Sequence, residues 1–306
     1  MPIQSVSPPL QLVNDAFIKN SGVQLYLLRT DLMHTAIGGN KLFKLKYNLE
    51  EAEKQTKKTI ITFGGAFSNH IAATAAAGKE YGFETIGIIR GEKYPELNPT
   101  LKFAVECGMQ LQYISRIDYQ NKNTKEYLNS LNLQFDSFYL IPEGGSNDLG
   151  ILGCKEITQY INFDFNYVCC ACGTGASMAG IVLSLKKNQQ ALGFQSLKGK
   201  GYIKKEVGNW LQHFNYQGPA NWNINEDYHF GGYAKTNSEL IDFINRLEKD
   251  NNIPLDPVYT GKMMFGIYDL IQNGFFKKGE NIVAIHTGGL QGNAGFEYLR
   301  SEGKKS

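Results

Sequence analysis

The stretch Gly38-Gly-Asn-Lys-Leu-Phe-Lys44 decides how this 306-residue chain is interpreted. It places two glycines and an amide directly before Lys41, where the pattern of apolar residues predicts that a helix begins. The positive end of the helix dipole disfavours an ammonium ion, and an amine that has lost its proton can form an imine with a carbonyl compound. Lys44 shares that face of the helix, so spacing alone leaves both lysines as alternatives.

Two further glycine-containing turns follow predicted strands. The strand Thr59–Gly65 leads into Ser68, a residue type that caps helices, and the strand 167–172 leads into Gly173-Thr-Gly-Ala-Ser177. Free backbone N–H groups and the dipole at such helix starts favour an anion, such as a phosphate or a carboxylate. The second turn lacks the third glycine of a dinucleotide fingerprint. A helix start without any ligand remains an alternative for both turns.

Strand and helix signals alternate along the chain, which is typical of an α/β fold with mostly parallel sheets flanked by helices. The stretch 193–230 shows little periodicity and carries no prediction. The predicted strands are 59–63, 85–89, 111–114, 138–141, 167–172 and 281–286, and the predicted helices include 41–55, 68–81, 124–132, 150–161, 177–186, 237–249 and 262–273.

The length of the chain exceeds what one hydrophobic core usually holds, so we expect two domains. The segment Glu143-Gly-Gly-Ser-Asn147 is typical of a return from one domain to the other. We therefore predict a small α/β domain at 45–149 and a discontinuous large domain formed by 1–44 and 150–306. The active site is expected in the cleft between them, where loops at the carboxyl ends of the strands face each other.

Composition argues against several classes of protein. The net charge of +2, with no run of five like charges, argues against nucleic acid and anionic membranes as partners. No segment approaches ~18 apolar residues, and the first residues lack the pattern of a secretory signal. Five cysteines, an odd number, favour a reducing cytoplasm. Cys169 and Cys172 form a C-x-x-C, but no second pair completes a metal site, so we interpret them as small buried hydrophobes.

Longer motifs connect these turns to a known family. The chain contains Gly38-Gly-Asn-Lys-x-x-Lys-Leu45, Gly64-Gly-x-x-Ser-Asn-His70, Glu143-Gly-Gly-Ser-Asn147, Asp256-Pro-Val-Tyr-Thr-Gly-Lys262 and His286-Thr-Gly-Gly289. This set resembles the pyridoxal-phosphate-dependent D-cysteine desulfhydrase and 1-aminocyclopropane-1-carboxylate deaminase family, within the tryptophan-synthase-β-like fold, and covers most of the chain. The resemblance implies a two-domain homodimeric enzyme that binds pyridoxal 5′-phosphate and a small amino acid.

The resemblance also implies which residues hold the cofactor. Lys41 would carry it covalently, which selects Lys41 over Lys44. Asn69 would bind the cofactor's ring oxygen, and Thr287 would face its ring nitrogen. The turn implied to hold the phosphate consists of Gly173, Thr174, Gly175, Ala176 and Ser177.

A second group of residues is implied at the substrate. Ser68 would lie at the substrate carboxylate and take part in proton transfer, and Tyr233 and Tyr259 would flank the substrate as catalytic groups. The residues implied to contact substrate are Ser68, Asn69, His70 and Thr260. Without the resemblance, the tyrosines and His70 would be interpreted as ordinary core or rim residues.

Two positions separate the members of the family. The deaminases resemble one another in a glutamate after Asp-Pro-Val-Tyr and a leucine in the His-x-Gly-Gly loop. This chain has Thr260 and Thr287 there, which together with His70 follow the desulfhydrase pattern. The expected reaction is elimination from D-cysteine to pyruvate, hydrogen sulfide and ammonia, with Lys41 or Ser68 removing the Cα proton. The alternatives are the cyclopropane deaminase, which yields 2-oxobutyrate and ammonia, an amino-acid synthase, and a non-catalytic amino-acid-binding protein.

Overall fold

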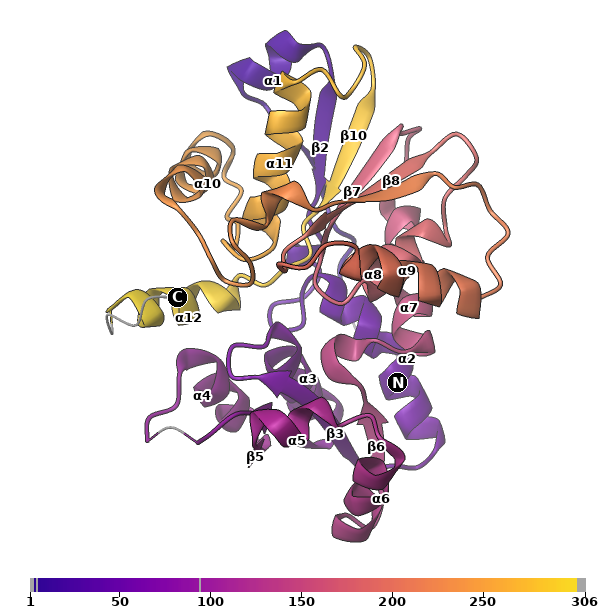
Figure 1. The fold of residues 1–306 in the computed structure, drawn as a ribbon, viewed down its shortest axis with the longest axis vertical. Coiled ribbons are helices and arrows are strands. Elements are labelled where there is room, and N and C mark those ends of the chain that lie inside the picture. Colours follow the sequence, from indigo (N-terminus) through magenta and orange to yellow (C-terminus); the bar gives the residue numbers. More distant parts are fainter. Residues whose placement is uncertain (1–2, 4, 94, 302–306) are drawn as a thin grey trace.

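We describe the fold from a computed structural model, which describes residues 3, 5–93 and 95–301 (Figure 1). Two sheets, each flanked by helices, form the upper and lower parts of the view. Strands and helices alternate along the chain, as an α/β fold requires. Over this part of the chain, no helix is both long enough and apolar enough to cross a membrane.

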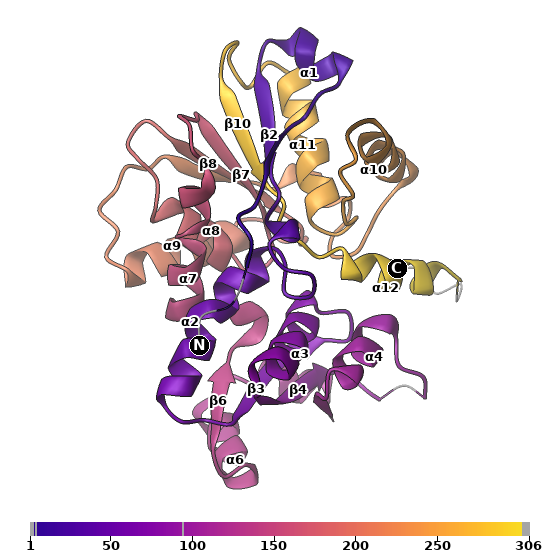
Figure 2. The same cartoon turned by 180° about the vertical axis from the view of Figure 1, so that it is seen from behind.

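The larger sheet has six strands in the order β1-β2-β10-β7-β8-β9. All neighbouring pairs are parallel except β1 with β2. The strands are β1 Leu10–Leu12, β2 Gln24–Leu28, β7 Tyr167–Cys172, β8 Gln190–Gln195, β9 Trp222–Asn225 and β10 Asn281–Ile285. Seen from behind, β2 and β10 lie side by side although they are far apart in the sequence (Figure 2).

The two faces of this sheet bury different helices. One core contains Val168, Cys170 and Cys172 of β7. It also contains residues of the helices α2 (Asn40–Lys54), α7 (Asp148–Cys154), α8 (Ala176–Val182) and α9 (Tyr202–His213). Cys169 belongs to the other core, which forms with α10 (Ser238–Asn251) and α11 (Thr260–Gln272). Successive residues of a strand point to opposite faces, so Cys169 and Cys172 lie on opposite sides of the sheet. All five cysteines are free thiols. The interpretation of the C-x-x-C as buried hydrophobes is confirmed.

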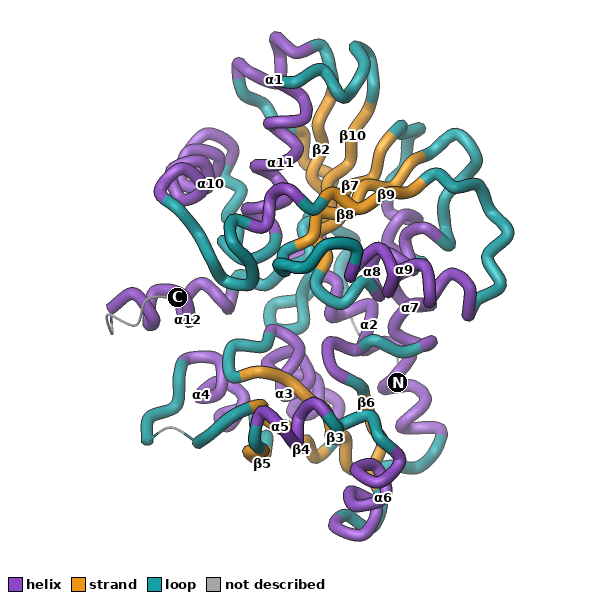
Figure 3. The backbone as a smooth tube through the Cα atoms, in the orientation of Figure 1, coloured by secondary structure: helices purple, strands orange, loops and turns teal. Residues whose placement is uncertain are grey.

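The smaller sheet has four parallel strands in the order β5-β4-β3-β6. Its strands are β3 Thr59–Gly65, β4 Glu84–Arg90, β5 Gln110–Ile114 and β6 Phe138–Ile141, and its helices are α3 Asn69–Tyr81, α4 Pro99–Glu106, α5 Arg116–Gln120 and α6 Lys125–Gln134. Apolar runs bounded by turn residues predicted these four strands correctly. Both sheets and the loops between them stand out in Figure 3.

The remaining helices lie mostly around the larger sheet. They are α1 Ala16–Ser21, α2 Asn40–Lys54, α7 Asp148–Cys154, α8 Ala176–Val182, α9 Tyr202–His213, α10 Ser238–Asn251, α11 Thr260–Gln272 and α12 Gln291–Ser301, with short 3-10 turns at Thr30–Leu32, Glu143–Gly145, Ile157–Tyr160 and Asp227–His229. All strands of the smaller sheet come from 59–141, and those of the larger sheet come from either side of that range. The domain limits at 44/45 and 149/150 stay a prediction.

Two predicted helices are shorter than expected. The segment 150–161 divides, because α7 ends at Cys154 and the backbone N–H of Glu156 bonds to Gly153, three residues back, before a separate 3-10 turn. The segment 177–186 ends at Val182. There the Ser184 hydroxyl donates to the Ile181 carbonyl at 2.6 Å, a local bond that competes with helix continuation.

Candidate active site

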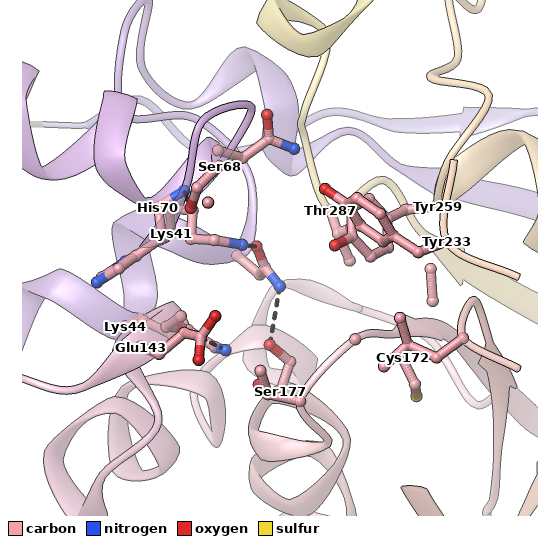
Figure 4. A pocket seen from close by; sticks show the side chains of 18 of the residues that line it. Lys41, Lys44, Ser68, His70, Glu143, Cys172, Ser177, Tyr233, Tyr259 and Thr287 are labelled. Carbon is pink, nitrogen blue, oxygen red and sulfur yellow. Dashed lines mark hydrogen bonds between the residues drawn. The ribbon is translucent and has the colours of Figure 1, made fainter. Parts of the chain in front are cut away.

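A cavity of about 400 Å³ lies where loops of the two sheets meet, and most predicted site residues line it. In Figure 4, Tyr233, Tyr259 and Thr287 stand across the cavity from Lys41, Ser68 and His70. The predicted residues in the lining are Lys41, Ser68, Asn69, His70, Gly173, Thr174, Gly175, Ser177, Tyr233, Tyr259 and Thr287. Two predicted residues, Ala176 and Thr260, are not part of the lining.

The loop before Lys41 rests on the loop after β10. Gly39, with φ of 77°, precedes α2, and a Cβ atom built on it would overlap the carbonyl oxygen of Thr287. Only glycine allows both this left-handed backbone and such a close approach. The Asn40 N–H donates to the same carbonyl at 3.2 Å. The start of α2 is therefore fixed against the loop that carries Thr287.

Lys41 is a partly buried lysine held by its neighbour. Its Nζ donates to Asn40 Oδ1 at 2.7 Å, and Asn40 Nδ2 donates to Ser177 Oγ at 2.9 Å, the bond drawn in Figure 4. Burial, reinforced by the positive charge of Lys44, lowers the pKa of Lys41 from its ordinary 10.5 to about 7. The sequence argument relied on the helix dipole, but burial is the larger cause. A large share of this amine is neutral at pH 7.

Lys44, the alternative to Lys41, also lines the cavity and is 3% exposed. Its Nζ donates to the Gly144 carbonyl at 2.8 Å, so this lysine is committed to the turn that follows β6. Burial lowers its pKa as well. Two lysines one helical turn apart, Lys41 partly buried and Lys44 buried, give this side of the cavity a positive character.

The start of α3 forms the second predicted turn. The Ser68 hydroxyl accepts the N–H groups of His70 and Ile71 at 3.2 and 3.3 Å, so the predicted N-cap is confirmed. The amide oxygen of Asn69 accepts a hydrogen bond from Gln291 of α12. That bond leaves the Asn69 NH₂ group to donate to a ligand in the cavity.

His70 presents an unpaired acceptor. The Thr62 hydroxyl donates its proton to the Ile141 carbonyl at 2.8 Å, so the 2.8 Å contact between Thr62 Oγ1 and His70 Nε2 requires that Nε2 carries a proton. Burial and the charges of Lys41 and Lys44 lower the pKa of His70 well below 6.5, which makes the ring neutral. Its Nδ1 atom is then a buried acceptor that no described residue pairs. Such an atom fits a ligand that donates a hydrogen bond.

The third predicted turn joins β7 to α8. Gly175, with φ of 82°, precedes α8, and no side chain caps the helix, so its first N–H groups are available to an anion. The Ser177 hydroxyl already accepts Asn40 Nδ2 and, at 3.6 Å, the Cys154 thiol, which leaves its own proton to donate. Gly173 lies under Tyr259, where an added Cβ would approach the ring to 3.2 Å.

The two predicted tyrosines meet edge to face, with ring centroids 6.1 Å apart. The Asp256 carboxylate fixes Tyr259, because it accepts the N–H groups of Val258 and Tyr259 at 2.9 and 2.6 Å. Burial first, and then the nearby Tyr233 and Asp256, raise the pKa of Tyr259 well above 10. This phenol keeps its proton throughout the neutral range.

Thr260, which the resemblance implied at the substrate, is not in the cavity lining. Its side chain is fully buried, and its hydroxyl donates to Asp256 Oδ2 at 2.6 Å while its N–H donates to the same atom. The residue therefore anchors the first turn of α11 and faces away from the cavity lining. His286 is likewise a core residue, since its Nε2 bonds the Pro254 carbonyl and its Nδ1 accepts the Gly288 N–H.

Several residues of the cavity lining were not predicted as site residues. Arg90 ends β4, and Glu143, in the turn after β6, pairs with Lys122 at 3.2 Å. Cys172 ends β7. All three lie at the carboxyl ends of parallel strands, which is where such sheets place ligands, so strand position was a usable signal.

The cavity fits pyridoxal phosphate on its own geometry. It combines a partly buried amine with a lowered pKa, an uncapped helix start beside Ser177, and the unpaired acceptor of His70. The amine suits the cofactor's aldehyde, and the helix start suits its phosphate.

Comparisons with known proteins agree with this geometry. A protein of Pyrococcus furiosus, provisionally named a 1-aminocyclopropane-1-carboxylate deaminase, is 32% identical over 89% of this chain and 86% of its own. A bifunctional mitochondrial D-cysteine desulfhydrase and 1-aminocyclopropane-1-carboxylate deaminase of Arabidopsis thaliana is 31% identical over 89% of this chain and 74% of its own.

Structure and family agree as well. The crystal structure of an ACC deaminase homologue superimposes with a TM-score of 0.86 at 28% identity, covering 98% of this chain and 95% of the other. The model of the family described as "Pyridoxal-phosphate dependent enzyme" matches residues 8–288. The predicted fold, cofactor and enzyme class are thereby confirmed, and the chain belongs to the pyridoxal-phosphate-dependent enzyme family.

Proposed function

We propose that this enzyme converts D-cysteine and water to pyruvate, hydrogen sulfide and ammonia. The proposal rests on the residues at positions 260 and 287, which separate the desulfhydrase pattern from the deaminase pattern. Thr287 lines the cavity, and Thr260 is bound to Asp256, so position 260 offers no carboxylate to a substrate. The deaminase pattern requires a glutamate at that position. Among the lining residues that the structure describes, Glu143 supplies the only carboxylate, and that group forms an ion pair with Lys122.

The cofactor would be held by groups from three elements. Lys41 would hold it covalently, the start of α8 with Ser177 would take the phosphate, and Asn69 and Thr287 would bind its ring. When bound, pyridoxal phosphate withdraws electron density from the substrate and so makes its Cα proton acidic. The neutral hydroxyl of Thr287 would leave the ring nitrogen largely unprotonated.

Proton transfer falls to residues of this chain. The neutral Lys41 amine, with its pKa lowered to about 7, is suited to take the Cα proton, and Ser68 stands beside it in the lining as the alternative base. The Asn69 amide would orient the substrate carboxylate, beside the start of α3 whose His70 and Ile71 N–H groups Ser68 caps. The protonated phenols of Tyr259 and Tyr233 are suited to give a proton to the departing sulfur.

Product analysis tests the proposal directly. The purified enzyme is given D-cysteine, L-cysteine and the cyclopropane amino acid in separate reactions, and sulfide, pyruvate and 2-oxobutyrate are measured. We expect sulfide and pyruvate in equal amounts from D-cysteine and at most a trace from L-cysteine. Release of 2-oxobutyrate from the cyclopropane substrate, with no sulfide from D-cysteine, would replace this proposal by the deaminase.

The deaminase is the second candidate because the Pyrococcus relative carries that name. One protein can combine both activities, as the name of the Arabidopsis relative states. The homodimer that the resemblance implies stays a prediction, which light scattering of the purified enzyme would test.

A further inference from the structure

Lys262 is a buried cation that lies outside the cavity lining. It sits in the first turn of α11, is 1% exposed, and donates from Nζ to the carbonyls of His229 at 2.9 Å and Gly232 at 2.8 Å. Burial lowers its pKa to about 8, an effect that the charge of Asp256 opposes. The side chain is therefore largely protonated at neutral pH. Burying a cation is costly, so its two carbonyl partners are needed to hold it there.

Those two carbonyls belong to a backbone segment of unusual conformation, the loop His229–Ala234. Four of its residues have left-handed backbone: Phe230 at φ of 53°, Gly231 at 95°, Gly232 at 128° and Ala234 at 56°. The conformation is unfavourable for a residue with a side chain, so contacts from outside must maintain it. Within the loop, the Gly232 N–H bonds the His229 carbonyl at 3.0 Å. Lys262 thus binds both ends of this turn.

Tyr233 follows Gly232 directly and is the residue that this loop delivers to the cavity. Its ring stands edge to face with that of Tyr259, but it remains 43% exposed, so packing alone holds it weakly. Tyr259 is fixed by Asp256, which also caps the start of α11. The first turn of α11 therefore contacts both the loop that carries Tyr233, through Lys262, and the Asp256 carboxylate that fixes Tyr259, through Thr260.

We propose that Lys262 is a positioning residue that clamps the loop His229–Ala234 onto α11 and thereby sets the place of Tyr233 over the cavity. The role of Tyr233 at the substrate rests on the proposed function, whereas the clamp itself does not. Lys262 does not line the cavity. By binding the two carbonyls, it holds the loop in the conformation that places the Tyr233 ring at the cavity.

Hydrogen exchange of the holoenzyme tests the clamp. Lys262→Met keeps an unbranched side chain close to the same length but removes its charge and donors, and Lys204→Met, at an exposed lysine bonded to Asn223, is the matched control. We expect amides of 231–235 to exchange at least about tenfold faster in Lys262→Met, with α11 itself unchanged. Unchanged protection of the loop, or equal acceleration along all of α11, would overturn the proposal.

Kinetics test the link to Tyr233. With D-cysteine, Lys262→Met should lower kcat/KM about 10- to 100-fold, the cost of a misplaced active-site group. In a Tyr233→Phe background the same change should have little further effect, because both act through one residue. If the two substitutions instead lowered kcat/KM by factors that multiply in the double variant, the proposal would be overturned.

Lys262→Arg keeps a cation and should restore part of the loop protection if Lys262→Met folds poorly. An enzyme that releases no sulfide from D-cysteine would refute the proposed function, while hydrogen exchange would still decide the clamp.

Discussion

The neutral amine of Lys41 can be measured without any turnover. With a pKa of about 7, about half of the Lys41 side chains are neutral at pH 7, against about 0.03% for a lysine at its ordinary value of 10.5. The neutral fraction is thus raised about 1,600-fold. In the cofactor-free protein, Lys41 should therefore react with acetic anhydride at pH 7 far faster than Lys54, whose side chain is 80% exposed. Mass spectrometry of the peptides gives both rates as a function of pH.

The structure also predicts how the titration of Lys41 changes with its neighbour. Lys44→Met removes the second-largest cause of the lowered pKa, so the labelling midpoint of Lys41 should move to higher pH. Lys46→Met is the control, because Lys46 lies on the same helix but is paired with Glu156 at 2.7 Å. A midpoint of Lys41 above about pH 9 in the wild-type protein would contradict the burial argument, since an amine so basic would be almost wholly charged at neutral pH.

Three further substitutions test single contacts of the site. Ser68→Ala removes the cap of α3 and should lower the free energy of unfolding in urea by about 1 kcal/mol, and an unchanged midpoint would contradict the cap. Thr260→Val breaks the buried bond to Asp256 and should cost about 1–3 kcal/mol while KM stays the same, whereas a raised KM at full stability would return Thr260 to the substrate. Gly39→Ala forces a methyl group onto the Thr287 carbonyl and should abolish the absorbance band of bound cofactor, which full cofactor occupancy would refute.

The parallel strands were the most predictable part of the fold, because each is a short apolar run between turn residues. The limits of 138–141 and 167–172 agree with β6 and β7. Helix α9 was missed although Ile203, Val207 and Leu211 recur at a spacing of four, which is the signal of a buried helical stripe. The neighbouring strand β9 has a single buried residue, Ile224, and so offers no alternation to detect.

Within the site, features that depend on adjacent residues could be predicted from the sequence, whereas features that depend on distant residues could not. The Ser68 cap and the glycine turn depend on adjacent residues, and the sequence predicts both. Lys44 could not be placed, because its burial depends on the Gly144 turn, about 100 residues away in the chain. The hydrogen bond of Thr260 could not be predicted either, because the capture of its hydroxyl by Asp256 depends on how the loop before α11 closes, which residue type alone does not specify.

The pairing of β2 with β10 determines when during synthesis the site can exist. Thr30 beside β2 donates to the His286 carbonyl, 256 positions away, and Gly39 rests on Thr287. A nascent chain in which β10 has not yet been made has Lys41, Asn40 and Ser177 but lacks the Thr287 carbonyl on which the start of α2 rests. We expect stable cofactor binding to follow completion of the larger sheet. Until then β2 has β1 on one side, and its other edge is open to a chaperone or a second nascent chain.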